Sequence, residues 1–227
     1  MSEPKKIIQS PYDYAANIRD GYHRFDFPKC LEWIETHGKL WYGQDFYIDG
    51  DDHSLIFNLV IYAIGDEQFC RKRGLSLDKG ILLTGPIGCG KTSLLNLLVP
   101  FFSNDRQYLV KSTRSIVLEF EVDGFIVINR YGRGIPNRIY FGDYKSICFD
   151  DLGLEQVRKH YGNECNVMAE ILLSRYELFN TKKVLTHATT NLSASELESL
   201  YGNRVRSRMR AMFNLLAFSA NAVDKRK

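Results

Sequence analysis

The sequence lacks several features that would place it in a specialised class of protein. Its five cysteines never stand at Cys-x-x-Cys spacing, so neither a zinc knuckle nor a redox dithiol is indicated, and free thiols in a reducing compartment are expected. No apolar run is long enough to span a membrane, and residues 1–6 lead into no sustained apolar stretch typical of a signal peptide. Internal repeats and low-complexity segments are also missing. We therefore expect a cytoplasmic globular protein.

The chain also lacks a large excess of either charge, because 30 basic residues nearly balance 27 acidic ones and leave a formal net charge of +3. This excess is too small to indicate a nucleic-acid partner by itself. The hydrophobic fraction of 44% is average for a soluble protein, and 227 residues bury a core without disulfides. The length fits one domain with an extension, or two small domains.

The first third of the chain is rich in aromatic residues. Residues 1–20 are polar, contain Pro4 and Pro11, and are expected to form a loosely held lead-in. Residues 21–75 carry many aromatic side chains, which indicate either a partner-docking surface or, as we favour, an ordinary core. Apolar residues at helical spacing predict a helix around Leu55–Ala63.

From Lys79 onward, short apolar strands alternate with helical patterns. Strands are expected at Gly80–Thr84, Leu109–Thr113, Tyr144–Asp150 and Lys182–Thr189, and helices at Thr92–Val99 and Val167–Phe179. Arg114–Phe120 is compatible with a helix or a strand, and we favour a helix. Phe125–Tyr131 is compatible with either. Such alternation predicts an α/β fold with a parallel sheet covered on both faces.

A glycine-rich loop follows the first of these strands. Its spacing, Gly-x-x-x-x-Gly-Lys-Thr, is the P-loop pattern, in which glycines let successive backbone N–H groups converge on a phosphate. The lysine reaches the β- and γ-phosphates, and the threonine hydroxyl holds Mg²⁺. We predict ATP and Mg²⁺ as ligands, with Lys91 also catalytic and Thr92 a metal ligand. The predicted nucleotide-binding residues are Gly85, Pro86, Ile87, Gly88, Cys89, Gly90, Lys91, Thr92 and Ser93.

Two adjacent carboxylates end the strand at Tyr144–Asp150. P-loop proteins place there the carboxylate that anchors Mg²⁺, so Asp150 is predicted to hold the metal and Asp151 to orient or activate the attacking water. A surface acid pair is the alternative. Because open α/β sheets bind ligands at the carboxyl ends of their strands, we expect both motifs in one crevice.

A polar residue, Asn191, follows the strand at Lys182–Thr189. At this position it is a candidate to hydrogen-bond the γ-phosphate or the lytic water, the role called sensor 1. The alternative is a helix cap, because a helical pattern follows it. His187, on the same strand, is expected in the core or behind the residues that touch the ligand.

Basic residues dominate the end of the chain, with seven against one acid, Asp224. Arg204 and Arg208 share one helix face, as do Arg206 and Arg210. One face is a candidate to meet a phosphate on a neighbouring subunit and the other to meet nucleic acid. A solvated face is the alternative.

Three segments together resemble one family: Gly202–Arg210, Thr189-Thr190-Asn191 and Phe149–Gly153. They are similar to the DnaC-type bacterial helicase loaders and the related IstB-type transposition helper ATPases, over roughly residues 78–227. The resemblance implies an AAA+ P-loop NTPase fold with a parallel five-stranded sheet, helices on both faces and no full C-terminal lid domain. It also implies a strand order: the sensor 1 strand, at Lys182–Thr189, lies between the strand before the P-loop (Walker A) and the strand that ends at Asp150 (Walker B).

The resemblance further implies roles for two arginines in a homo-oligomer. Arg208 would be the arginine finger that reaches the ATP of the adjacent protomer, and Arg226 would be the sensor 2 residue within its own subunit. In the family an extra helix after the second strand helps to hold single-stranded DNA. Arg114–Asp123 and the basic residues Arg130, Arg133 and Arg138 are placed for this role, or form a solvated face.

On this interpretation residues 1–75 form an aromatic-rich N-terminal extension, a candidate to bind a partner, and residues 76–227 form an AAA+ ATP-binding domain. The expected function is ATP hydrolysis in DNA replication by a helicase loader-like protein, with a helicase or a transposase as partner. Most AAA+ proteins carry Glu where this chain has Asp151, and the shorter side chain implies slow hydrolysis. A transposition helper, a small P-loop kinase and an ATP-gated adaptor that barely hydrolyses ATP remain alternatives.

Overall fold

The computed structural model describes residues 9–133, 145–155, 158–160 and 163–226. The chain forms two compact units. The first, called here the N-terminal unit, contains the residues up to Leu75 together with Gly88–Gln107 and Phe218–Lys227; the second, the sheet unit, contains Ser76–Ile87 and Tyr108–Ala217. Within the described ranges, no helix is long and apolar enough to cross a membrane.

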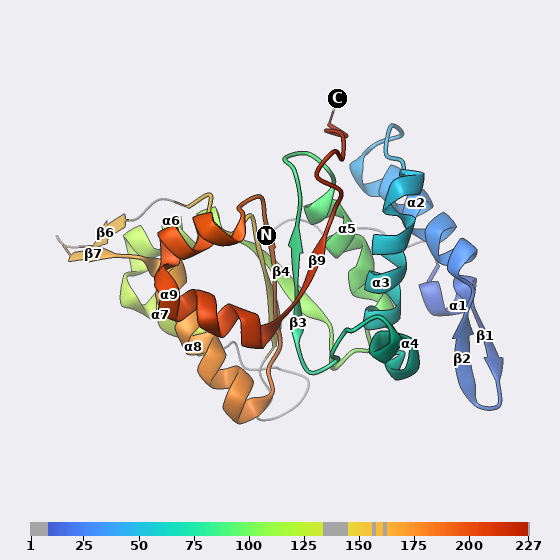
Figure 1. Cartoon of the computed structure of the whole chain (residues 1–227), viewed down its shortest axis with the longest axis horizontal. Coiled ribbons are helices and arrows are strands. Elements are labelled where there is room, and N and C mark those ends of the chain that lie inside the picture. Colours follow the sequence, from blue (N-terminus) through green and yellow to red (C-terminus); the bar gives the residue numbers. More distant parts are fainter. Residues whose placement is uncertain (1–8, 134–144, 156–157, 161–162, 227) are drawn as a thin grey trace. The chain divides into compact units, whose positions relative to one another are not determined.

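The sheet unit is built on five parallel strands, drawn as arrows in Figure 1. Their order across the sheet is β4-β5-β8-β3-β9, so β8 lies between β5 and β3. The strand that precedes Asn191 therefore separates the strand that ends at Asp150 from the strand that leads to the P-loop, as the family resemblance implies. The strands are β3 (Gly80–Thr84), β4 (Tyr108–Ser112), β5 (Ser146–Asp150), β8 (Thr186–Thr190) and β9 (Phe213–Ala217).

The neighbouring strands β5 and β8 are buried along their whole length, including their polar residues. All five residues of β5 and all five of β8 are buried. His187 is one of them, and its Nδ1 accepts a hydrogen bond from the backbone N–H of Ile81 at 3.1 Å, which confirms it as a core residue. Gly80 is required where β3 approaches β8, because a Cβ there would lie 1.7 Å from the Thr186 carbonyl oxygen.

Four helices pack with these strands around one hydrophobic core. Apolar residues from β5 and β8, such as Phe149 and Ala188, contact residues of the helices, such as Ile116 and Leu172. A short antiparallel hairpin of β6 (Arg158–His160) and β7 (Asn163–Cys165) precedes α8. The helices are α6 (Thr113–Asp123), α7 (Phe125–Gly132), α8 (Val167–Lys182) and α9 (Ala194–Met212). The helix expected at 114–120 is therefore confirmed, and the ambiguous segment 125–131 is helical.

The N-terminal unit is mainly helical. Its elements are α1 (Pro11–Ala15), β1 (Ala16–Arg19), β2 (Tyr22–Phe25), α2 (Phe27–Tyr42), η1 (Gly50–Asp52), α3 (His53–Ala63), α4 (Glu67–Lys72), α5 (Lys91–Leu98) and η2 (Val99–Phe101). Helices α2, α3 and α5 contact one another. Trp33 is buried and stacks on His37 with 3.7 Å between ring centroids, so part of the aromatic content belongs to the core, as we favoured.

One expectation for this unit is wrong. The described part of the polar lead-in is structured: the Ser10 hydroxyl accepts a hydrogen bond from the Tyr12 N–H and starts α1, and β1 follows directly. Pro11 occupies the first turn of the helix, where its missing N–H has no cost, so proline marks a helix start here. The division into an extension at 1–75 and an ATPase domain at 76–227 stays a prediction.

Candidate functional site

The glycine-rich loop runs from the end of β3 to the start of α5. Gly85, Pro86 and Ile87 belong to the sheet unit, and the residues from Gly88 onward belong to the N-terminal unit. The predicted residues Lys91 and Thr92 thus lie in one unit, and Asp150, Asp151 and Asn191 lie in the other.

Two glycines of the loop adopt a backbone conformation that other residues rarely adopt. Gly88 has φ 79° and Gly90 has φ 101°, both in the region that favours glycine, and Gly90 is the N-cap of α5. A side chain at residue 88 would also displace Asp224, whose Oδ1 lies 1.9 Å from the position of a Cβ. The N-terminus of α5 favours a negatively charged ligand, and Ser93 lies in its first turn.

Lys91, the first residue of α5, is buried at 5% exposure. Its Nζ lies 3.8 Å from Cys89 Sγ in the same loop. Burial raises the pKa of the Cys89 thiol, although the nearby Lys91 acts in the opposite direction. An ammonium group in a site with little water attracts an anion more strongly than an exposed one, because the effective dielectric constant is lower.

The C-terminal segment lies against this loop within the N-terminal unit. The backbone N–H of Lys225 donates to the Gly88 carbonyl at 3.0 Å. Its Nζ forms an ion pair at 2.5 Å with Asp52, which is 4% exposed, and lies 5.6 and 5.7 Å from the ring centroids of Tyr47 and Phe218. Lys225 is therefore a cation held beside the P-loop backbone.

Arg226, predicted as the sensor 2 residue, lies differently. Its guanidinium donates to the Asp224 carboxylate at 3.1 and 2.9 Å, and its side chain is 65% exposed. Sequence reasoning did not single out Lys225 or Asp52, which are 173 positions apart along the chain. The acidic run Asp49–Asp52 was a visible signal, but nothing in its spacing pointed to residue 225.

In the sheet unit, a threonine hydroxyl bonds both the carboxylate of Asp150 and the backbone of Asp151. Thr189, on β8, donates its Oγ1 hydrogen to Asp150 Oδ1 on β5 at 2.7 Å. The same Oγ1 accepts the backbone N–H of Asp151 at 2.8 Å. Asp150 is 8% exposed, so the surface acid pair offered as an alternative does not describe it. Thr189 was named in the sequence only as part of the segment that resembles the family.

Asp151 has the backbone conformation of a strained residue. Its φ of 57° lies in the left-handed region, which is uncommon outside glycine and is tolerated best by Asn and Asp. Besides the bond from its N–H to Thr189, its carbonyl oxygen accepts from Thr113 Oγ1 at 2.9 Å and from the Leu154 N–H at 3.2 Å. These bonds hold the turn, because a strained backbone persists only where the surrounding structure fixes it.

Asn191 is not a helix cap. The N-cap of α9 is Ser193, which forms a capping box with Glu196. The Oδ1 atom of Asn191 is buried and finds no hydrogen-bond partner within the described ranges. An amide oxygen without a partner at the carboxyl end of a buried strand can accept a hydrogen bond from a water molecule or another donor.

The arginine block lies on the second half of α9, after a break at Gly202, whose φ is 82°. Arg208 is half-buried, and its guanidinium lies over the ring of Tyr176 in the same chain, 5.1 Å from the centroid. Its Nη1 is buried and has no hydrogen-bond partner among the residues described. Arg206 and Arg210 line an apolar cavity of about 280 Å³, whereas Arg204 is exposed.

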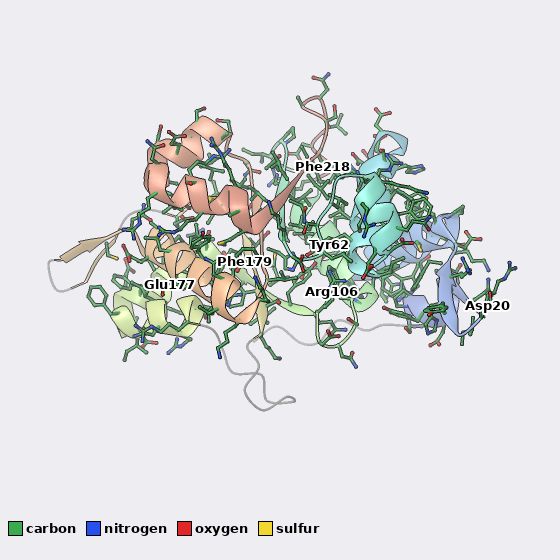
Figure 2. The ribbon with its side chains drawn as sticks, turned by 60° about the horizontal axis from the view of Figure 1, so that its bottom comes forward. Asp20, Tyr62, Arg106, Glu177, Phe179 and Phe218 are labelled. Carbon is green, nitrogen blue, oxygen red and sulfur yellow. The ribbon has the colours of Figure 1, made fainter. Side chains whose placement is uncertain are left out.

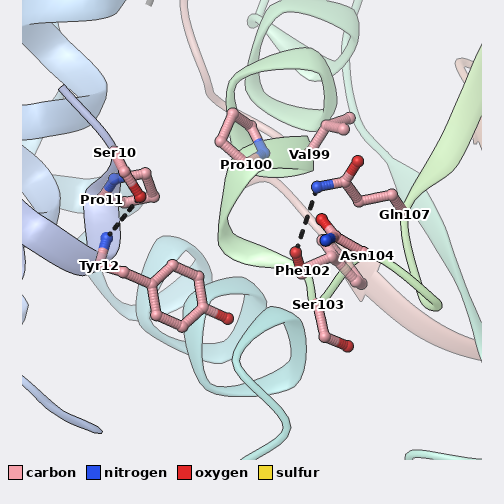
Figure 3. A pocket seen from close by; sticks show the side chains of 9 residues that line it. All are labelled: Ser10, Pro11, Tyr12, Val99, Pro100, Phe102, Ser103, Asn104 and Gln107. Carbon is pink, nitrogen blue, oxygen red and sulfur yellow. Dashed lines mark hydrogen bonds between the residues drawn. The ribbon is translucent and has the colours of Figure 1, made fainter. Parts of the chain in front are cut away.

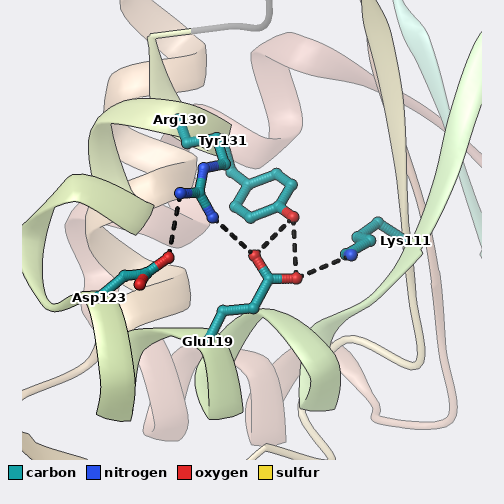
Figure 4. Close-up of polar contacts among 5 residues, drawn as sticks. All are labelled: Lys111, Glu119, Asp123, Arg130 and Tyr131. Carbon is teal, nitrogen blue, oxygen red and sulfur yellow. Dashed lines mark hydrogen bonds and ion pairs between the residues drawn. The ribbon is translucent and has the colours of Figure 1, made fainter. Parts of the chain in front are cut away.

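The helices α6 and α7, expected near DNA, are joined by a polar network (Figure 4). Glu119 accepts hydrogen bonds from Tyr131 and from Arg130, the latter at 3.1 Å, and pairs with Lys111 at 2.8 Å. Arg130 also pairs with Asp123 at 3.0 Å. Although burial opposes it, hydrogen bonds from Lys111 and Tyr131 hold the pKa of Glu119 below its ordinary value. Arg130 thus has its charge balanced, Arg133 is exposed, and Arg138 lies outside the described residues.

A separate hollow of about 590 Å³ lies in the N-terminal unit (Figure 3). Its lining comes from the start of α1 and from the segment at and after η2, including Tyr12, Pro100 and Gln107. None of the predicted site residues lines it, so it is not the predicted nucleotide site.

The donors available for Mg²⁺ are few. No group of three or more His, Cys, Asp or Glu suited to a metal occurs in the described ranges. Mg²⁺ commonly takes one or two protein oxygen ligands and completes its shell with substrate phosphates and water. The hydroxyl of Thr92 and the carboxylate of Asp150 fit that chemistry, each in its own unit.

Comparisons with known proteins agree with this fold. No protein-family model and no curated protein matches the chain. The solved DnaC helicase loader is similar at 17% identity with a TM-score of 0.50, covering 76% of this chain and 92% of that one. A candidate primosome component from Streptococcus pyogenes serotype M3 is similar at 17% identity with a TM-score of 0.50, covering 78% and 84%. At this identity the likeness concerns the fold, and the chain therefore has the AAA+ P-loop NTPase fold that the DnaC helicase loader also has.

Proposed function

We propose that this protein binds ATP with Mg²⁺ and hydrolyses it as a helicase loader-like AAA+ ATPase that acts on DNA. One observation carries the proposal: three adjacent strands, β5, β8 and β3, end in Asp150, in Thr190 followed by Asn191, and in the P-loop, respectively. The hydroxyl of Thr189 holds the first two of these ends together. Polar groups gathered at the carboxyl ends of parallel strands are the usual place for a ligand in such sheets.

In this proposal each residue has its own task. The backbone of Gly85–Gly90 cradles the phosphates, Lys91 neutralises the β- and γ-phosphate charge, and Thr92 and Asp150 hold Mg²⁺. Bound Mg²⁺ supplies charge neutralisation of the transferred phosphoryl group. Asp151 orients the attacking water and Asn191 bonds the γ-phosphate or that water. The hydrogen bonds between the Asp151 backbone and the side chains of Thr189 and Thr113 support this role, because they restrict the positions that the Asp151 carboxylate can occupy.

Two arginines complete the site in the proposal. Arg208 acts as the finger that reaches the ATP of an adjacent protomer in a homo-oligomer, and Arg226 acts as sensor 2. The support for Arg208 is its half-buried guanidinium with one nitrogen not hydrogen-bonded within the described ranges. Lys225 is a second candidate for the sensor 2 role, because it lies against Gly88.

The partner belongs to DNA replication in this proposal. A replicative helicase is the first candidate, and a transposase is the partner if the chain is instead an IstB-type helper. Single-stranded DNA is the proposed ligand of α6 and α7. Arg114 and Arg133 are exposed there, whereas the ion pairs of Arg130 make it a weaker candidate.

The first test is nucleotide affinity, measured by titration calorimetry. Lys91→Ala removes the side-chain cation of the loop, so tight ATP binding should disappear while the circular dichroism spectrum stays unchanged. Lys29→Ala, which removes an exposed lysine from α2, is the matched control and should bind ATP normally. Undiminished affinity in Lys91→Ala would refute the P-loop assignment.

The second test follows the phosphate. Release of inorganic phosphate should be slow and should rise with single-stranded DNA, and sizing with a non-hydrolysable ATP analogue should reveal assembly. Transfer of the γ-phosphate to an acceptor instead of water would favour a kinase. Binding without release under either condition would favour an ATP-gated adaptor.

A further inference from the structure

The hairpin of β1 and β2 projects nearly all its side chains into solvent. The strands pair antiparallel through Ile18 opposite His23 and Arg19 opposite Tyr22, and the turn at Asp20 and Gly21 has φ 53° and 78°. Figure 2 labels Asp20 at this turn. Isolated two-stranded ribbons are marginally stable in water, so something must hold this one.

The N-terminal unit holds the hairpin along one face. The ring of Tyr12, from α1, meets His23 and Phe25 edge-on at centroid distances of 5.2 and 5.1 Å. At the base, the Asp26 N–H donates to the Ala15 carbonyl at 2.8 Å. Because side chains alternate along a strand, Ile18 lies on this same face as His23 and Phe25.

The opposite face is cationic and aromatic. Alternation and register place Asn17, Arg19, Tyr22 and Arg24 on it, and all four are exposed, Tyr22 at 73%. The face carries no carboxylate, and neither Arg19 nor Arg24 forms an ion pair with another residue in the described ranges. Asp20 is the acid of the hairpin and lies in the turn.

We propose that this face binds single-stranded nucleic acid. A base stacks on Tyr22, and backbone phosphates pair with Arg19 and Arg24, which lie on opposite strands about 7 Å apart along the ribbon. Asn17 adds a hydrogen-bond donor. The face has one ring and no aliphatic side chain, so it lacks the apolar centre that a protein partner buries. The proposal extends the proposed function by giving DNA a surface outside the ATP site.

The experiment measures fluorescence anisotropy of a labelled oligothymidylate of about 20 nucleotides, long enough for one binding unit. It uses the full chain without nucleotide, so that ATP-driven assembly does not contribute. Tyr22→Ala should weaken binding by about 5- to 150-fold, the range for losing one stacked base, and Tyr22→Phe should restore it. Replacing both Arg19 and Arg24 with alanine should make the plot of log binding constant against log salt concentration less steep. The slope should shrink in magnitude by about 1.4, equivalent to two phosphate contacts.

Two controls separate this face from general effects. Ile18→Ala alters the opposite face of the same hairpin, and Arg71→Ala removes one exposed charge from α4; both should bind like the unmodified chain. The Lys91→Ala chain should also keep this binding, so failure of the ATP assignment and failure of this proposal are told apart. Three results would each overturn the proposal: unchanged affinity in Tyr22→Ala, an equal loss of affinity in the two controls, or tighter binding of duplex DNA than of the single strand.

Discussion

Replacing Lys225 with methionine tests most directly how the C-terminal segment is held against the P-loop backbone. Methionine keeps apolar volume beside Tyr47 and Phe218 but removes the ammonium group from Asp52. Breaking a fully buried ion pair costs about 3–5 kcal/mol, because the remaining charge is left uncompensated. The side chain of Lys225 is 16% exposed and that of Asp52 is 5% exposed, so water offsets part of this cost. We therefore expect a loss of about 2–3 kcal/mol in the free energy of unfolding.

The assay is urea unfolding of four chains: the unmodified protein, Lys225→Met, Asp52→Asn and the double variant. The double variant buries a neutral amide beside methionine, so it should be more stable than the sum of the two single losses predicts. Arg226→Met is the matched control. Its pair with Asp224 is exposed, so this substitution should leave the free energy of unfolding almost unchanged.

Two results would refute this reasoning. Equal stabilities of Lys225→Met and Arg226→Met would mean that the buried pair does not form in solution. Additive losses in the double variant would mean that Asp52 and Lys225 do not interact. Measuring ATP affinity on the same chains also decides which of the two cations reaches the nucleotide.

Three further predictions concern the sheet unit. Asp151→Asn should keep ATP·Mg²⁺ binding but lose turnover, whereas Asp150→Asn should also weaken the Mg²⁺-dependent part of binding; identical effects in calorimetry and phosphate release would mean that the two roles are misassigned. Arg208→Ala should bind ATP almost normally and hydrolyse it about 10³–10⁵-fold more slowly, and mixing it with Asp151→Asn protomers should restore part of the phosphate release; a mixture that stays inactive contradicts a finger acting across subunits. Because the pKa of Glu119 is held below its ordinary value of 4.5, its contribution to stability is present above that pH and is lost as the pH falls through the lowered value. In urea unfolding, Glu119→Gln should therefore be less stable than the unmodified chain at neutral pH, and the two free energies of unfolding should converge in acid. A difference that stays constant with pH would exclude this linkage.

Local sequence patterns predicted those features that depend only on residues close together in the chain. The P-loop spacing, the carboxylates after a buried strand and the helix at 114–120 each rest on neighbouring residues. The position of β8 between β3 and β5 came from the family resemblance, because strand order depends on pairings that no local pattern records.

The contacts that sequence reasoning missed join distant residues. Thr113 and Asp151 are 38 positions apart, and Asp52 and Lys225 are 173 apart. Periodicity cannot reveal such pairs. The hairpin at residues 16–25 was missed for another reason: each of its strands is only four residues long, too short for a pattern of period two to stand out.

The left-handed backbone at residue 151 affects whether aspartate or glutamate is favoured there. Aspartate adopts a positive φ more readily than glutamate, so the turn and the shorter acid suit each other. A change to glutamate would lengthen the reach of the carboxylate and also disfavour the turn to which Thr113 and Thr189 bond. A lineage that gained the longer acid would therefore need a second substitution nearby to relax that backbone. The choice of acid at residue 151 is accordingly constrained by main-chain handedness as well as by side-chain chemistry.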